Sequence, residues 1–250
     1  MALFKSGNPS LKNVFEKVGQ ATDASQAMTV NGTIGKTGIL LALVAFGAIV
    51  TWNMFGSLSY SGLVMPLFWI GLIGGLVTAL IITFKKELAP YLSPVYAILE
   101  GFVLGGISVM LNAYYPGIAL QAIILTFAVT TIMLALYYFK VIRATQKFRS
   151  VVIIATGAIA IFYLVSLILS FFGITSPAYA ATPLGIGISV FVVIIAALNL
   201  ILDFDFIEQG AEYQAPKFME WYGAFGLMVT LIWLYIEILR LLAKIAASSR

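Results

Sequence analysis

Residues 37–84 of the chain read TGILLALVAFGAIVTWNMFGSLSYSGLVMPLFWIGLIGGLVTALIITF, and residues 150–202 read SVVIIATGAIAIFYLVSLILSFFGITSPAYAATPLGIGISVFVVIIAALNLIL. Neither stretch contains a charged residue. A membrane-spanning helix needs about 20 apolar residues, so each stretch is long enough for two spans and a turn. Clusters of Gly, Ser and Pro place the two turns at residues 56–62 and 173–177.

The composition extends this pattern to the whole chain. Of the 250 residues, 62% are hydrophobic and 10% are charged, whereas about 25% of the residues of a soluble domain are charged. A soluble fold of this size cannot bury so much apolar surface, but seven membrane spans can expose it to lipid. We therefore predict an all-α polytopic membrane protein with seven transmembrane helices.

The residue types that are missing exclude most catalytic chemistry. The chain has no cysteine and no histidine, so it cannot use thiolate nucleophiles, Cys-ligated metals, Ser-His-Asp catalysis or imidazole-ligated zinc. The G-x-G-D motif of aspartyl intramembrane proteases is also missing. We expect neither an enzyme nor a bound cofactor. The basic balance of the chain is expected to reflect loops on one membrane face rather than nucleic-acid binding.

The positions of the charges predict two regions and an orientation. Residues 1–36 are polar and are expected to form an N-terminal tail, and residues 37–246 are expected to form the seven-helix transmembrane domain. Seven spans put the termini on opposite sides, with eleven of the 14 basic residues on the N-terminal side. Because Lys and Arg accumulate in cytoplasmic loops, we expect a cytoplasmic N-terminus.

Four acidic residues fall at or near membrane depth. An ionised carboxylate costs several kcal/mol there, so its default interpretation is functional. The four residues are Glu100, Asp203, Asp205 and Glu237.

The position of Asp203 on its helix points it inward. At about 100° per residue, Asp203 shares a face with small and polar side chains, and such a stripe favours the bundle interior over lipid. Asp205 lies on the opposite side with two further acids, which indicates a solvated acidic face just beyond the membrane. The stripe of Asp203 is Gly185, Ser189, Val192, Ala196 and Asn199, and the further acids are Glu208 and Glu212.

Glu237 and Glu100 also lie on or beside stripes of small residues. For Glu237, two interpretations stay open: an i,i+3 ion pair with the candidate charge partner Arg240 near the membrane surface, or an interior acid that meets an acid or base of another span. Glu100 lies beside Gly101 and Gly105, whose G-x-x-x-G spacing is typical of close helix packing. We expect Glu100 to pair with a base or to share a proton with another acid.

Three short segments resemble the Bax inhibitor-1 family (transmembrane BAX-inhibitor-motif proteins), in its long bacterial branch. Residues 96–106, YAILEGFVLGG, are similar to the family's E-G-x-x-L-G segment. Residues 199–208, NLILDFDFIE, are similar to its span-six Y-D-x-x-x-I, and residues 234–239, LYIEIL, resemble its L-Y-x-D-x-x. The three segments occur in the family's order along seven expected spans, and the resemblance covers about residues 28–246.

This resemblance implies a fold with one central helix inside a ring of six, in a bacterial inner membrane. It also implies a pH-sensitive calcium leak in which Asp203 and Glu237 share protons, gate the pore and meet the calcium ion. The second acid here is a glutamate, one methylene longer, and residues 210–220 look like an insertion between the two acids. Asp205 and Glu100 are therefore alternative partners.

The residue types support the same mechanism in less detail. Without histidine, any switch between pH 5 and 8 must come from perturbed carboxylates, and carboxylate oxygens are the ligands that calcium prefers. We expect the lipid bilayer and calcium ions as partners. The alternative function is a non-transporting regulator that binds other membrane proteins, such as a protease or a cell-death protein.

Overall fold

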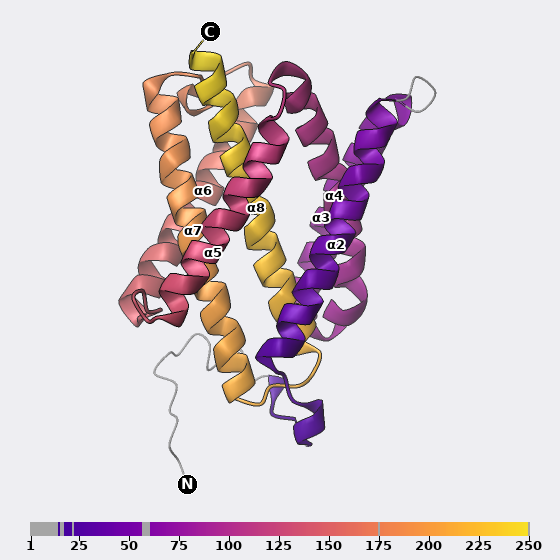
Figure 1. Cartoon of the computed structure of the whole chain (residues 1–250), viewed down its shortest axis with the longest axis vertical. Coiled ribbons are helices and arrows are strands. Elements are labelled where there is room, and N and C mark those ends of the chain that lie inside the picture. Colours follow the sequence, from indigo (N-terminus) through magenta and orange to yellow (C-terminus); the bar gives the residue numbers. More distant parts are fainter. Residues whose placement is uncertain (1–14, 16–17, 22, 57–60, 175, 250) are drawn as a thin grey trace. The chain divides into compact units, whose positions relative to one another are not determined.

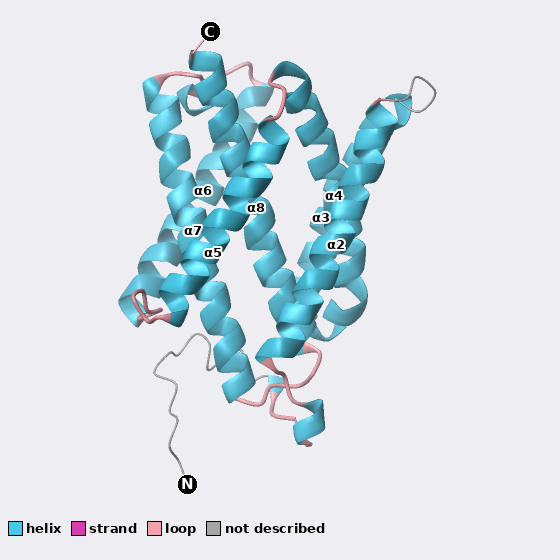
Figure 2. Ribbon diagram, in the orientation of Figure 1, coloured by secondary structure: helices cyan, strands magenta, loops and turns pink. Residues whose placement is uncertain are grey.

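The computed structural model of the chain describes residues 15, 18–21, 23–56, 61–174 and 176–249. These residues form helices joined by short connections, without any strand (Figure 2). Seven of the described helices are long and apolar enough to cross a membrane. Figure 1 labels them in chain order: α2 (Val30–Phe55), α3 (Val64–Phe84), α4 (Ala89–Tyr114), α5 (Ile118–Tyr138), α6 (Gln146–Phe171), α7 (Pro183–Glu212) and α8 (Met219–Ser248).

These seven helices confirm the predicted all-α polytopic membrane protein. With 21 to 30 residues each and a rise of about 1.5 Å per residue, every helix reaches across the ~30 Å hydrocarbon core. In lipid a backbone must satisfy its own hydrogen bonds, which is why long apolar runs become helices. The central helix inside a ring of six stays a prediction.

The first spanning helix is longer than the charge pattern predicts. Helix α2 begins at Val30, ahead of the predicted boundary at residue 37, because Thr29 caps it by accepting the Gly32 N–H at 3.0 Å. Lys36 therefore lies inside a span rather than in the polar tail, of which residues 1–14 lie outside the described residues.

The expected insertion, residues 210–220, is helical at its two ends and non-helical between them. It contains the last turn of α7, which ends at Glu212, and the start of α8 at Met219. The connection between these two helices is residues 213–218. Whether residues 210–220 are an insertion stays a prediction.

The chain divides into two compact units. Unit 1 comprises Met1–Met110 and Asp203–Val229, and unit 2 comprises Leu111–Leu202 and Thr230–Arg250. Both α7 and α8 contribute one segment to each unit.

In unit 1, helices α2 and α4 approach closely through glycines. A Cβ added at Gly47 of α2 would lie 2.7 Å from the Ile98 carbonyl oxygen, and one added at Gly105 of α4 would lie 2.5 Å from the Ala48 carbonyl oxygen. The stripe beside Glu100 is therefore a packing surface, as its spacing predicts.

In unit 2, helices α6 and α7 share a small apolar core. Ile159, Val192 and Ile195 are buried together, and the Asn199 side-chain amide donates to the Thr156 hydroxyl at 2.8 Å.

Large apolar side chains are exposed along helices of both units. They include Leu76 in unit 1, and Ile154 and Phe191 in unit 2. Such side chains are suited to contact with the lipid bilayer.

Candidate functional site

Glu237 lies on α8 in unit 2, and its environment is polar although it is buried. The residue is 1% exposed. The Tyr163 hydroxyl of α6 donates to Glu237 Oε1 at 2.9 Å, and the Arg240 guanidinium donates to the same oxygen at 3.1 Å. Arg240 also donates to the Tyr163 hydroxyl oxygen at 2.8 Å, which closes a triangle of three hydrogen bonds.

Two aromatic rings hold the guanidinium of this triangle in place. The Arg240 guanidinium carbon lies 5.1 Å from the centre of the Tyr163 ring and 5.9 Å from that of Tyr179. Tyr179 belongs to the 3-10 helix η4 (Pro177–Tyr179). A guanidinium near an aromatic face gains cation–π attraction, so Arg240 is kept beside Glu237 although a third of its side chain is exposed.

Both sequence interpretations of Glu237 are therefore partly met. The i,i+3 ion pair with Arg240 is present. A group of another span also reaches Glu237, but that group is the tyrosine hydroxyl of Tyr163 rather than an acid or a base.

Glu100 of α4 lies in unit 1, where it faces helix α3. A Cβ added at Gly75 of α3 would lie 2.9 Å from Glu100 Oε1, so the missing side chain of Gly75 leaves room for the carboxylate. Glu100 shares a hydrogen bond with Tyr96, one turn earlier on α4. The expectation of a base or a second acid is not met by this contact, since the partner is a neutral hydroxyl.

Asp203 and Asp205 belong to the segment of α7 in unit 1. Asp203 faces α8, because a Cβ added at Gly226 would lie 3.8 Å from Asp203 Oδ1. Asp205 accepts a hydrogen bond from the Gln209 amide at 2.9 Å, one turn further along α7. Asp203 thus belongs to unit 1 and Glu237 to unit 2, and the pairing of these two acids stays a prediction.

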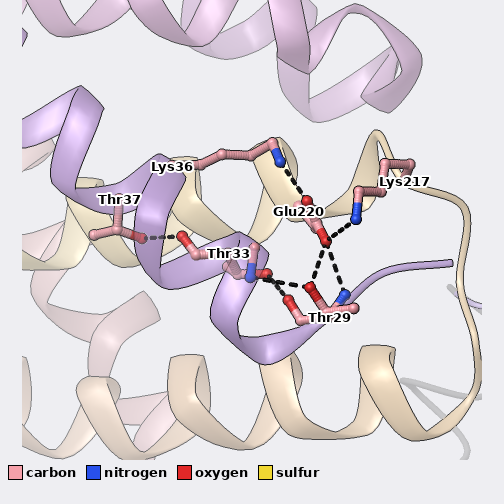
Figure 3. Close-up of polar contacts among 7 residues, drawn as sticks. Thr29, Thr33, Lys36, Thr37, Lys217 and Glu220 are labelled. Carbon is pink, nitrogen blue, oxygen red and sulfur yellow. Dashed lines mark hydrogen bonds and ion pairs between the residues drawn. The ribbon is translucent and has the colours of Figure 1, made fainter. Parts of the chain in front are cut away.

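A fifth acid, Glu220, is fully buried at the start of α8 in unit 1 (Figure 3). Its Oε1 accepts hydrogen bonds from the Thr29 backbone N–H at 2.9 Å and the Thr29 hydroxyl at 2.8 Å, and it lies 2.9 Å from Lys217 Nζ. Its Oε2 is ion-paired with Lys36 of α2. We call these four residues, Thr29, Lys36, Lys217 and Glu220, the clasp.

The clasp depends on a glycine and on the segment ahead of α2. A Cβ at Gly32 would overlap the Glu220 carboxylate, so a larger residue there would push the helices apart. Ahead of the clasp, the Met28 N–H donates to the Ala215 carbonyl oxygen at 2.7 Å. Near the beginning of the described chain, the Phe15 ring stacks on Phe206 of α7 at 5.2 Å.

Sequence reasoning overlooked Glu220 and Tyr163. Glu220 lies in the segment that was expected to be an insertion. Its partners Lys36 and Thr29 lie 184 and 191 positions away in the sequence. The one usable signal was the Thr29-x-x-Gly32 start of a helix, which is typical of an N-cap. Tyr163 was visible as the one tyrosine within α6, where a hydroxyl at membrane depth needs a partner.

The described residues contain no group of three or more His, Cys, Asp and Glu side chains that could hold a metal ion. The three acids with described partners differ in how their charge is compensated. Glu237 is held by one cation and one hydroxyl, Glu100 by one hydroxyl, and Glu220 by two cations. Glu220 is therefore the most strongly compensated of the three.

The family model described as Bax inhibitor 1 like matches residues 8–247. The search of curated proteins and the search of solved structures give no match.

Proposed function

Because the chain belongs to the Bax inhibitor 1 like family, we propose that it is a pH-sensitive cation leak, with calcium as the favoured ion. The charge states of Asp203 and Glu237 control passage in this proposal. The observation that carries it is the buried Glu237 carboxylate, held at membrane depth by Tyr163 and Arg240.

The geometry suggests how a proton would act at Glu237. In the ionised state the carboxylate accepts from both Tyr163 and Arg240, which ties α6 to α8. Protonation removes the charge that Arg240 compensates, and a charge-assisted hydrogen bond weakens to a neutral one. Since the chain has no histidine, carboxylates of this kind are the groups that can sense pH near neutrality.

Calcium is proposed as a passing ion rather than a resident one. It takes six to eight oxygen ligands in stable protein sites. The described residues hold no group of three or more acids that could bind a metal ion, so water must supply most of the ligands. Such weak coordination lets a calcium ion leave the protein as well as enter it.

Calcium flux into liposomes tests the proposal. Purified wild type, Asp203→Asn, Glu237→Gln and the double variant are compared between pH 6 and 8, with Glu212→Gln, an exposed acid on α7, as the matched control. We expect each single variant to flatten the pH dependence and the double variant to add little, because coupled sites are not additive.

Each other result has a definite meaning. A wild-type pH profile in Asp203→Asn would remove that acid from the gate, and additive effects would make the two acids independent. Absence of any flux through the purified wild type would overturn the leak and leave the alternative, a regulator that binds other membrane proteins.

We further propose that the chain lies in a bacterial inner membrane with its N-terminus in the cytoplasm. Supporting this, Lys36 near the start of α2 meets Glu220 at the start of α8. Lys86, just before α4, lies 5.3 Å from the Tyr222 ring of α8. These basic helix ends therefore share one end of unit 1, as the positive-inside rule requires.

Reporter fusions test this orientation. A reporter after Arg250 should report the periplasmic side, and one inserted at 144–146 should report the cytoplasm. Two reporters on the same side would exclude seven complete spans.

A further inference from the structure

Lys244, in the last part of α8, ends in a cage of three oxygen atoms within unit 2. Its side chain is buried, with 7% of the residue exposed. The ammonium Nζ donates to the Ala178 carbonyl oxygen at 2.5 Å, the Ser189 hydroxyl oxygen at 2.6 Å and the Gly185 carbonyl oxygen at 3.0 Å. An ammonium has three N–H donors and no acceptor, so each donor finds one oxygen.

The surrounding elements build the cage. Ala178 lies in η4, whereas Gly185 and Ser189 lie one turn apart at the start of α7. Ala178 and Ser189 are 4% and 2% exposed. A Cβ at Gly185 would overlap the Ala180 carbonyl oxygen, so the connection between η4 and α7 is packed directly against the cage.

The ligand set is neutral and indicates which cation it suits. Two backbone carbonyls and one hydroxyl resemble the oxygen rings with which selectivity filters replace the hydration shell of a potassium ion. Calcium sites, in contrast, draw mainly on carboxylates. The nearest acid along α8 is Glu237, two turns earlier, and it is engaged by Tyr163 and Arg240.

We propose that the Ala178 carbonyl, the Gly185 carbonyl and the Ser189 hydroxyl form a monovalent-cation site whose resident cation is the Lys244 ammonium. The tethered charge joins η4, α7 and α8 without any free ion and keeps free cations out. The inference does not depend on a calcium leak, since it concerns what fills the cage and not what crosses the membrane.

Removal of the ammonium should turn the cage into a site for free cations. Methionine ends one atom short of lysine, so Lys244→Met keeps the apolar part of the side chain and removes the nitrogen. We expect ammonium or potassium chloride to raise the unfolding midpoint of Lys244→Met in detergent by a few °C, on the order expected for a filled binding site. Choline chloride at the same concentration should not raise the midpoint of the variant. The midpoint of the wild type should not change in any of the three salts.

Two further variants sharpen the test. In Lys244→Ala, n-propylammonium replaces the missing atoms and should stabilise the variant more than ammonium does. In Lys244→Met combined with Ser189→Ala, the loss of one cage oxygen should abolish the effect of ammonium.

Equal midpoints in ammonium, potassium and choline, or an effect that survives Ser189→Ala, would overturn the proposal. If a variant does not fold in choline, its recovery is compared in the three salts. Folded protein recovered only in ammonium or potassium chloride supports the site. Equal recovery in all three salts, or no recovery in any of them, counts against it.

Discussion

Helix α8 carries two buried glutamates, and their surroundings differ in one decisive respect. Glu220, in unit 1, is compensated by two lysines and by two hydrogen bonds from Thr29. Glu237, in unit 2, is compensated by Arg240 and one tyrosine hydroxyl. The two residues are almost equally buried, at 0% and 1% exposure, so burial by itself does not distinguish them.

The difference teaches which acid is the stronger structural anchor. Removing one partner of a buried ion pair leaves an uncompensated charge, which is strongly destabilising. Neutral Glu220 would leave two lysines without their counter-charge, of which Lys36 is 18% exposed. Neutral Glu237 would leave one arginine, which is a third exposed and lies over two rings. Glu220 is therefore held as an anion by more partners, and Glu237 is the less strongly compensated of the two acids.

The largest expected effect follows from Glu220→Gln. The amide cannot compensate Lys36 and Lys217, so we expect a loss of about 3–5 kcal/mol in the free energy of unfolding. The measurement is thermal or denaturant unfolding in detergent. The exposed Glu212→Gln serves as control, with an expected change within about 0.5 kcal/mol. A Glu220→Gln variant as stable as this control would show that the clasp is not a structural anchor.

Glu237→Gln should cost less. The amide oxygen can still accept from Tyr163, and Arg240 keeps its contacts with the rings, so the expected loss is about 1–3 kcal/mol. The same unfolding experiment measures it. A loss as large as that of Glu220→Gln would remove the distinction drawn between the two acids.

Glu100→Gln tests a third, half-buried acid, whose described hydrogen-bond partner is the neutral Tyr96. Because an amide oxygen can replace the carboxylate as an acceptor for a hydroxyl, we expect a loss of no more than about 1 kcal/mol. Calcium flux in liposomes is measured beside stability. Altered flux at unchanged stability places Glu100 on the ion path, a large loss of stability makes it an anchor like Glu220, and no change in either removes it from the candidate site.

The smallest effect is expected within the clasp itself. Lys217 is 44% exposed and Lys36 is 18% exposed, and exposed ion pairs contribute about 0.2–1 kcal/mol. We expect Lys217→Ala to fall in that range and Lys36→Ala to exceed it, since Lys36 also packs over the Trp221 ring at 5.5 Å. The unfolding midpoints of the two variants show which lysine contributes more to stability. The reverse order would mean that Lys217 is the main counter-charge of Glu220.

Much of the local structure could be predicted from the residues. The uncharged runs predicted the helices, and the spacing of Gly101 and Gly105 predicted the close packing of α4. The three-residue spacing of Glu237 and Arg240 predicted their ion pair, which was one of the two interpretations left open. All of these depend on residues within one or two helical turns of each other, where backbone geometry fixes the distance.

The partners of the buried charges could not be predicted in this way. Glu220 meets Lys36 across 184 positions, and Lys244 meets Ala178 across 66. Hydrophobic periodicity reports which face of a helix is apolar, but it does not report which residue of another helix stands opposite.

The sequence by itself determined that this chain is a membrane protein of seven helices, because lipid allows a long apolar backbone few other conformations. The tertiary structure decided the partners of each buried charge. It gave Glu220 two lysines, Glu237 an arginine and a tyrosine, and Lys244 three neutral oxygens. The physical reason is that the cost of burying a charge depends on the atoms within about 3 Å of it, and here most of those atoms come from distant parts of the chain.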